Sequence, residues 1–183
     1  MLFDTHAHLD DDRFDKDRDE VVNQCKLDGV ELILNAGSNM ETSVKAIALA
    51  KKYELIYAAV GVHPHDAAEM DEETAGVLAA LAENNKVRAI GEIGLDYHYD
   101  FSPRDVQKKR FIEQIDLARQ IGLPVIIHDR EAHGDVMNIF KKTRIKEVGG
   151  VLHSFSGSAE MALECIKLGL YISIRMQGKQ LKQ

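Results

Sequence analysis

The sequence predicts an α/β protein built on a parallel (β/α) barrel. Short apolar runs alternate along the chain with amphipathic helical segments, which is typical of strands joined by covering helices. The runs are continuously apolar rather than alternating, as expected of parallel strands that are buried on both faces. Histidines and carboxylates follow most of the runs, and a parallel barrel gathers all such positions on one face.

Seven apolar runs predict strands, and helical periodicity predicts a helix after each of the first six. The strands are expected at about 1–5, 30–36, 55–61, 87–91, 123–127, 149–152 and 170–174. The helices are expected at about 16–28, 40–53, 71–84, 103–122, 132–142 and 158–168. Ser102 and Pro103 are residue types preferred at the N-cap and the first position of a helix.

Two architectures fit this alternation, an open doubly wound sheet and a closed barrel. Six histidines and two carboxylates spread over five strand ends favour the barrel, because an open sheet concentrates its site at one switch point. No glycine-rich phosphate loop is visible. We therefore expect a TIM-type (β/α)8 barrel forming a single domain over residues 1–183. It would be incomplete, with about seven strands and without the eighth strand and the last helices, because 175–183 is polar and has no strand pattern.

Composition indicates an ordinary globular protein rather than a membrane protein or a nucleic-acid coat. The net charge of −7 argues against a broad phosphate-tracking surface, but not against an enzyme that grips one strand end. Cys25 and Cys165 lie beside apolar neighbours, which favours two free thiols over a disulfide. No long apolar span and no basic signal region occur, so we expect a cytoplasmic protein without membrane association. No feature of the sequence indicates a protein partner.

The strongest functional signal is the pair His6 and His8 at the end of the first predicted strand. Residues i and i+2 of a strand point to the same face, so both imidazoles can reach one point, and imidazole is the commonest metal ligand among side chains. Windows of four residues behind the strands cover roughly 15% of the chain, which would hold about one of the eight histidines by chance. Six histidines fall there, namely His6, His8, His63, His65, His128 and His153, and two acids, Glu92 and Asp96, follow the fourth run.

Histidine with carboxylate is a donor set that suits Zn²⁺, Mn²⁺ or similar ions. A carboxylate placed between two ions holds them about 3.5–4 Å apart, which is the arrangement used by many nucleases and phosphatases. Chemistry of this kind produces a reactive hydroxide from water near neutral pH. The residues alone leave open whether the substrate is a phosphodiester, a C–N bond or another ester.

Five ordered stretches resemble the TatD family of metal-dependent deoxyribonucleases. They are Met1 to Asp10, Gly61 to His65, Gly91 to Tyr97, Pro124 to His128 and Leu152 to Ser158. The resemblance implies a (β/α)8 barrel related to metal-dependent amidohydrolases, two divalent cations (Zn²⁺, Mn²⁺ or Mg²⁺), and hydrolysis of phosphodiester bonds at the ends of DNA, single-stranded DNA included.

The resemblance also implies a role for each matching residue. His6 and His8 would bind one metal, His128 and His153 the second, and Glu92 would bridge both and take part in catalysis. His63 would contact the substrate phosphate or assist proton transfer, and His65 is expected either to bind substrate or to be an exposed loop residue. The family's metal-binding aspartate, which follows strand eight in a Glu-Thr-Asp motif, has no counterpart here. An inactive product that only binds metal is therefore a further alternative.

Several neighbouring residues have two readings. Asp96 is expected either to orient a metal-bound histidine or to cap its loop, and Asp4 either to face the barrel and orient the ligands or to cap its strand. Three aromatic residues after the fourth strand are expected either to stack on unpaired bases or to pack within their own loop: Tyr97, Tyr99 and Phe101. His98 and His133 lie outside the strand-end windows and are expected at the surface.

Overall fold

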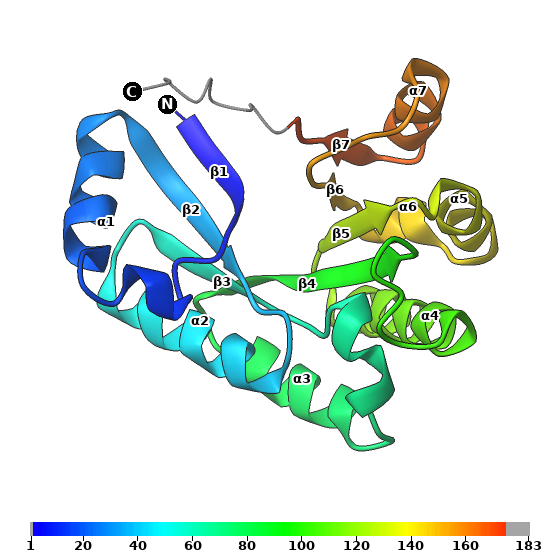
Figure 1. The fold of residues 1–183 in the computed structure, drawn as a ribbon, viewed down its shortest axis with the longest axis horizontal. Coiled ribbons are helices and arrows are strands. Elements are labelled where there is room, and N and C mark those ends of the chain that lie inside the picture. The colour runs from blue at the N-terminus through cyan, green and yellow to red at the C-terminus, as the bar shows by residue number, and fades with distance from the viewer. Residues whose placement is uncertain (1, 175–183) are drawn as a thin grey trace.

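The computed structural model describes residues 2–174 as one parallel sheet of seven strands. The strands follow one another in chain order, and each is hydrogen-bonded to its predecessor (Figure 1). They are β1 (Leu2–Ala7), β2 (Val30–Ala36), β3 (Ile56–Val60), β4 (Val87–Asp96), β5 (Val125–Arg130), β6 (Gly150–Leu152) and β7 (Leu170–Ile172).

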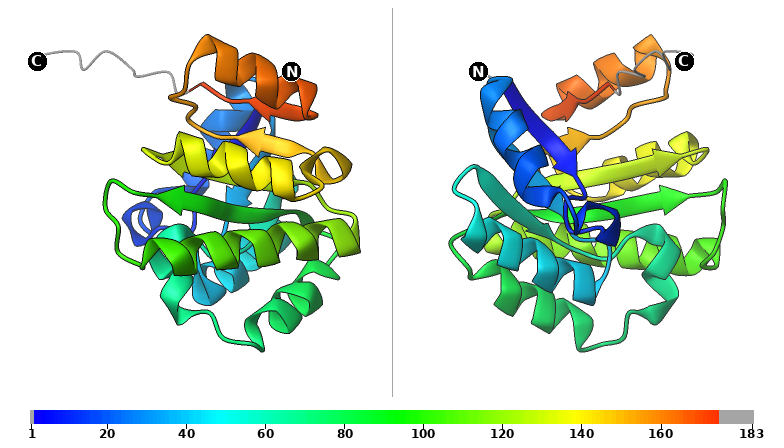
Figure 2. Two further views of the ribbon diagram at one scale, coloured as in Figure 1. Left: turned by 90° about the vertical axis from the view of Figure 1, so that its right-hand side faces the viewer. Right: turned by 60° about the vertical axis from the view of Figure 1, so that its left-hand side comes forward.

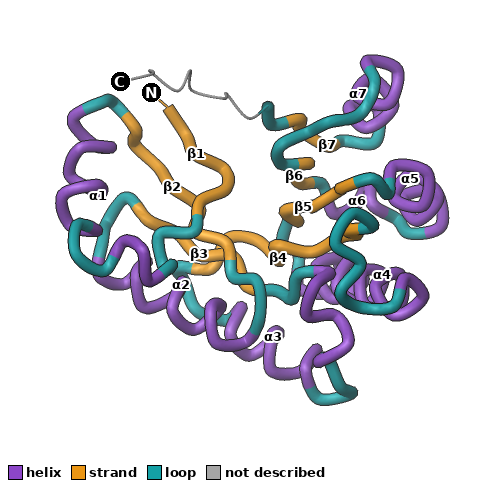
Figure 3. The backbone as a smooth tube through the Cα atoms, viewed as in Figure 1, coloured by secondary structure: helices purple, strands orange, loops and turns teal. Residues whose placement is uncertain are grey.

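Helices connect the strands and cover the outer face of the sheet (Figures 1 and 2). The α-helices are α1 (Arg18–Leu27), α2 (Met40–Lys52), α3 (Thr74–Ala82), α4 (Arg104–Ile121), α5 (His133–Lys142), α6 (Ile145–Val148) and α7 (Ala159–Lys167). Two short 3₁₀ helices, η1 (Asp12–Phe14) and η2 (Pro64–Glu69), follow β1 and β3. The sheet curves inside this helical layer, as the tube in Figure 3 shows. The expected parallel α/β architecture is thereby confirmed, with seven strands described within residues 2–174.

Two apolar clusters lie on the two faces of the sheet. The larger one fills the space between strands and helices, with Phe111, Ile115 and Phe140 almost fully buried against β-strand residues. The smaller one lies on the concave face and consists of Leu34, Ala36, Ala59, Ala89, Ile126 and Val151. An open apolar cavity of about 910 Å³ adjoins it, bordered by Phe3 of β1 and Tyr171 of β7. Burial on both faces explains why the strands are continuously apolar.

The structure corrects several expected boundaries. β4 and β5 continue to Asp96 and Arg130, because their pairing extends as far as these two residues; Glu92, Asp96 and His128 therefore lie within strands rather than after them. The interpretation of Ser102 as the cap of α4 is wrong, since the helix begins at Arg104 with Pro103 as its N-cap. The Ser102 hydroxyl instead donates to the His65 carbonyl and accepts from the Ala68 amide.

Other differences are small. α1 begins at Arg18 and α3 at Thr74, each later than expected, and the short helix α6 was not predicted. Asp71 precedes α3 and accepts hydrogen bonds from the Glu73 and Thr74 amides. Cys25 and Cys165 are free thiols, as expected. Within residues 2–174, no helix has the length and apolar character needed to cross a membrane. The polar stretch 175–183 lies outside the described residues.

Candidate metal centre

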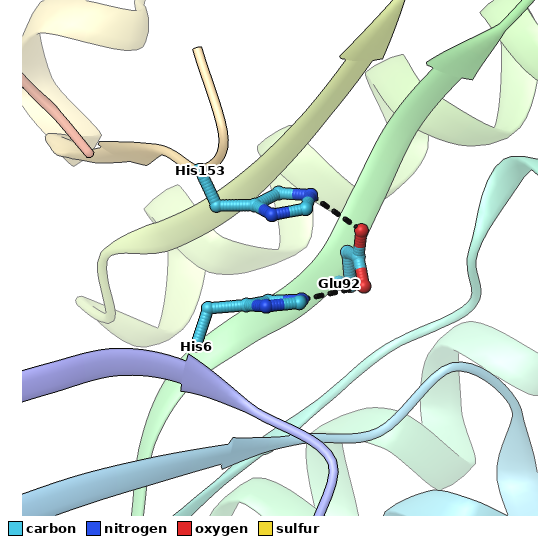
Figure 4. Close-up of side chains that lie close together, drawn as sticks. All are labelled: His6, Glu92 and His153. Carbon is cyan, nitrogen blue, oxygen red and sulfur yellow. Dashed lines mark hydrogen bonds and ion pairs between the residues drawn. The ribbon is translucent and has the colours of Figure 1, made fainter. Parts of the chain in front are cut away.

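Glu92 is the centre of the candidate site. Its side chain is almost fully buried, and five imidazoles surround its two carboxylate oxygens. Oε2 lies 2.8 Å from His6 Nε2 and 3.2 Å from His8 Nε2. Oε1 lies 2.6 Å from His153 Nε2, 2.8 Å from His128 Nδ1 and 3.5 Å from His63 Nε2. Figure 4 shows His6 and His153 approaching the carboxylate from β1 and from the residue that follows β6.

The parallel strands explain why residues so far apart in sequence meet here. Each histidine lies at or just beyond the carboxyl end of a strand, and parallel strands present these ends to one side. The His6 and His153 rings stack with their centroids 3.9 Å apart, which connects the first strand to the sixth across the concave face. The site is therefore assembled by the curvature of the sheet rather than by a local motif.

The electrostatics of the centre stabilise an ionised carboxylate. Burial alone would raise the pKa of Glu92, but hydrogen bonds from His128, His153, His6 and His63 hold the pKa well below its usual value. The centre thus combines one negative charge with a ring of nitrogen donors.

Four histidines of the centre divide into two kinds by the direction in which their pKa is shifted. Burial lowers the pKa of His63 and of His153, which favours their neutral forms. Burial opposes protonation of His8 and His128 as well, but contacts with Glu92 outweigh it and raise the pKa of both; Asp96 adds to the effect at His128. Neutral imidazole is the form that binds metal, so a metal ion bound at this centre would compete with protons at His8 and His128.

The residues present fit a divalent metal. Two sets of three ligand atoms lie within 4.8 Å of one another: His6, Glu92 and His153 form one, and His63, Glu92 and His128 form the other. The Nδ1 atom of His153 is buried and has no hydrogen-bond partner within residues 2–174. Nitrogen and carboxylate donors of this kind suit Zn²⁺ or Mn²⁺ better than an all-oxygen cage would.

Asp96 combines the two roles that its sequence context left open. Its Oδ2 lies 3.0 Å from His128 Nε2 and 3.0 Å from His65 Nε2, so it orients one imidazole of the centre and joins it to the histidine at the rim. Its Oδ1 accepts from the amides of His98 and Tyr99 and thus caps the following loop. The fully buried carboxylate keeps its charge, because burial is outweighed by these hydrogen bonds and the pKa of Asp96 is lowered.

Two buried glutamines of α4 fix the loops that carry these side chains. Gln114 accepts from the Val62 amide and donates to the Val62 carbonyl, immediately before His63. Gln107 accepts from the Asp96 amide and donates to the carbonyls of Asp96 and Ser102. Positions seven residues apart lie on the same helical face, so one helix braces both loops.

A separate set of contacts holds the segment after β1. The buried Asn35 side chain accepts from the Leu9 amide at 2.5 Å and donates to Asp10 at 2.7 Å. The neighbouring carbonyl of Ala36 lies 3.0 Å from His8 Nδ1. The end of β2 therefore fixes the direction in which His8 points, and leaves its Nε2 facing Glu92.

The structure thus brings together His6, His8, His63, Glu92, His128 and His153. His65 contacts Asp96 instead of Glu92, whereas His98 pairs with Glu131 and His133 with Asp129 outside the centre. Asp4 is exposed and accepts from the His6 amide. Sequence reasoning missed Asn35, Gln107 and Gln114. The signal that could have found them is a polar residue within an apolar strand or on the apolar face of a helix.

Comparison with known sequences supports one family. The profile described as TatD related DNase matches residues 3–181. A Bacillus subtilis protein named uncharacterized metal-dependent hydrolase YabD is 47% identical over 173 residues, which cover 94% of this chain and 68% of that protein. The Escherichia coli K12 protein named 3'-5' ssDNA/RNA exonuclease TatD is 37% identical over 174 residues, covering 94% of this chain and 66% of that protein. The chain spans about two thirds of the length of these curated relatives.

Solved structures agree with the sequence comparison. The crystal structure of YJJV, a TatD homologue from Escherichia coli K12, superposes with a TM-score of 0.86 at 33% identity, over 93% of this chain and 66% of that one. A TatD family hydrolase from Entamoeba histolytica gives a TM-score of 0.85 at 28% identity, over 94% of this chain and 64% of that one. On the combined evidence of sequence, fold and the arrangement around Glu92, the chain belongs to the family of TatD-related DNases.

Proposed function

We propose that this protein is a divalent-metal-dependent nuclease that removes nucleotides from the ends of DNA, with single-stranded DNA as the preferred substrate. The observation that carries the proposal is the convergence of five imidazoles on the one buried carboxylate of Glu92. Family membership and the name of the Escherichia coli relative, which includes RNA as well as DNA, support a nucleic-acid substrate.

In the proposed centre, Glu92 would take part in holding both of two divalent ions. His6 and His8 face Oε2 and would hold the first ion, while His128 and His153 face Oε1 and would hold the second. Bound cations would supply a nucleophile from water near neutral pH and neutralise charge on the reacting phosphate. Zn²⁺ and Mn²⁺ fit this donor set best, and Mg²⁺ is the third candidate.

His63 is proposed to hold or transfer a proton at its Nε2. This atom lies 3.5 Å from Glu92 Oε1, farther than the other four nitrogens, and the lowered pKa of the buried imidazole favours a neutral ring that can accept a proton. His65, half-buried at the rim and bound to Asp96, is proposed to contact the substrate. Asp96 keeps the His128 and His65 rings in a fixed orientation relative to one another.

The competing assignment is a hydrolase of C–N or carboxylic ester bonds, since the same fold and donor set support that chemistry. Purified protein would be supplied with Mn²⁺, Zn²⁺ or Mg²⁺ and assayed on end-labelled single-stranded DNA, RNA and double-stranded DNA, and in parallel on amide and ester substrates. Release of mononucleotides from single-stranded DNA supports the proposal. Turnover of amides or esters alone would replace it with the competing assignment.

Metal content gives an independent test. Elemental analysis of the dialysed protein should find close to two ions per chain, and the count should drop in the Glu92→Gln variant. His133→Ala is the matched control, because His133 is a half-exposed histidine that pairs with Asp129 outside the centre. A metal content near zero ions per chain for the unaltered protein would instead favour the inactive product, which performs no chemistry.

A further inference from the structure

We propose that Tyr99 and Phe101 form an aromatic platform on which an unpaired nucleobase of the substrate stacks. Both residues lie in the loop between β4 and α4, and this inference rests on the proposed function in so far as it takes single-stranded nucleic acid as the ligand. The platform is defined as the rings of Tyr99 and Phe101, with His65 beside them.

The side chains of Tyr99 and Phe101 are exposed to solvent. Phe101 is 69% exposed and Tyr99 is 48% exposed, although both belong to residue types that normally gain free energy by burial. The two ring centroids lie 5.4 Å apart at an interplanar angle of 30°. The His65 ring meets both rings edge-on, with centroids 5.4 Å from Tyr99 and 4.8 Å from Phe101. The three rings form one apolar surface that solvent reaches.

The loop that carries the rings is fixed at both ends, so their exposure does not come from a loosely held segment. Gln107 binds the backbone of Asp96 on one side and of Ser102 on the other. The Ser102 hydroxyl donates to the His65 carbonyl, which joins the loop to η2. Asp96 accepts from the Tyr99 amide. A platform held in this way loses little conformational entropy when a ligand binds.

The platform is connected to the candidate metal centre through three hydrogen bonds. His65 Nε2 and His128 Nε2 both contact Asp96 Oδ2 at 3.0 Å, and His128 Nδ1 lies 2.8 Å from Glu92 Oε1. The aromatic rings therefore stand a few side chains from the carboxylate around which hydrolysis is proposed. A nucleotide whose phosphate lies at the centre would place a neighbouring base within reach of the platform.

The charge around the platform suits a phosphate backbone. The Arg130 guanidinium lies 4.8 Å from the Tyr99 ring centroid, and no carboxylate within residues 2–174 forms an ion pair with it. A cation over an aromatic face makes a cation–π interaction with the ring, and the same cation can attract a phosphate group of the ligand. The protein carries a net charge of −7, so a local cation of this kind has to provide the attraction that the overall charge does not.

The geometry indicates stacking on one side rather than intercalation. A base sandwiched between two rings needs about 7 Å between their centroids, twice the optimal carbon–carbon contact distance. The observed 5.4 Å leaves no such gap between Tyr99 and Phe101. The base would stack on the solvent-facing surface of the pair. Every base has an aromatic face. The platform would therefore bind a strand that carries bases more tightly than one with abasic residues, whatever the sequence of the bases.

The test uses single-stranded oligonucleotides with 2-aminopurine near one end, bound in the presence of EDTA so that no turnover occurs. Unaltered protein should quench the fluorescence on binding, and should bind a normal oligonucleotide more tightly than one with abasic residues. The double variant with Tyr99→Ala and Phe101→Ala should lose the quenching, lose the preference for bases, and bind about 10-fold more weakly. Tyr99→Phe and Phe101→Tyr, which keep the rings, should restore all three.

Tyr171→Ala is the matched control, because this tyrosine is 78% exposed but lies on β7 beside the apolar cavity. It should leave quenching unchanged. Failure of the unaltered protein to quench, or equal binding by the double variant, would overturn the platform. The proposed function is judged separately, by cleavage: a protein that quenches but cleaves no oligonucleotide with any metal keeps the platform and loses the nuclease assignment.

Discussion

The two sides of the Glu92 carboxylate are built differently. On the Oε2 side, His6 lies in β1 and His8 just after it; β1 is the first strand of the sheet described for residues 2–174, and its pairing with β2 contains register shifts. The side chains of His6 and His8 are 17% and 36% exposed. On the Oε1 side, His63, His128 and His153 have side-chain exposures of 11%, 15% and 9%. Asp96 and α4 support this second side through buried hydrogen bonds.

The difference shows that one metal centre can combine a rigid half with an adaptable half. The Oε1 side is the more preorganised one, because Asp96 orients the His128 imidazole and Gln114 holds the backbone next to His63. The Oε2 side depends mainly on Asn35 and on the Ala36 carbonyl. We expect substitutions on the Oε1 side to affect folding and chemistry, and those on the Oε2 side to affect chiefly the affinity for one ion.

The largest effect is expected where the two sides meet. Glu92→Gln keeps the volume of the side chain but removes the charge that would offset two cations. Hydrolysis should fall about 1000-fold or more, equivalent to about 4 kcal/mol of transition-state stabilisation. The measurement is the rate of nucleotide release, with circular dichroism to show that the fold is retained. Activity within about 10-fold of the unaltered protein would rule out the bridging role.

A smaller effect is expected for His63, which belongs to the rigid side but lies farthest from Glu92. His63→Ala should lower kcat about 100-fold, a typical contribution of a proton-transfer group, while the metal content stays close to that of the unaltered protein. Turnover and elemental analysis are measured on the same sample. Parallel loss of metal and turnover would make His63 a metal ligand instead.

The asymmetry itself can be tested without metal. His128→Ala would leave both Glu92 and Asp96 with one buried partner fewer, whereas His8→Ala removes a half-exposed imidazole that contacts Glu92 and the Ala36 carbonyl. In urea unfolding with EDTA, we expect the free energy of unfolding to drop about 2 kcal/mol more for His128→Ala than for His8→Ala. Equal losses would show that the two sides are equally rigid.

The smallest effect is expected for Asn35, which acts on the adaptable side through the backbone. Asn35→Ala removes the contacts to Leu9 and Asp10, so the direction of His8 is less well fixed. We expect the affinity for one of two ions to fall about 10-fold, as is common when a group that orients a ligand is removed. Calorimetric titration with Zn²⁺ should resolve the weakened step. A uniform loss at both steps would contradict the assignment of Asn35 to one side.

Much of the centre could be predicted from the sequence, because its parts obey simple rules. His6, His63, His128 and His153 follow apolar runs, and parallel strands bring such positions together regardless of their separation in the chain. The seven strands were predictable for the same reason, since their apolar runs are short and are separated by helical periodicity.

The remainder depended on contacts that periodicity does not encode. Nothing in the run from Val87 to Gly91 indicates that β4 continues to Asp96, since this depends on pairing with β5. The role of Gln107 depends on a loop that lies beside the helix only in the folded state. The exposure of Phe101 is likewise a tertiary result, because an aromatic residue in an isolated loop sequence is equally compatible with burial.

The strand order has a consequence for the time course of folding. Each strand pairs with the one before it, so the sheet can grow from the N-terminus as the chain is synthesised, one connection after another. The candidate metal centre cannot form strand by strand in this way, because it needs residues from both ends of the sheet: His6 stacks on His153 and both contact Glu92. A nascent chain that ends before β6 lacks His153 and therefore offers Glu92 an incomplete set of imidazoles. Assembly of the centre therefore requires a chain synthesised at least as far as His153, and ions held on the two sides of Glu92 would favour chains whose sheet has already curved.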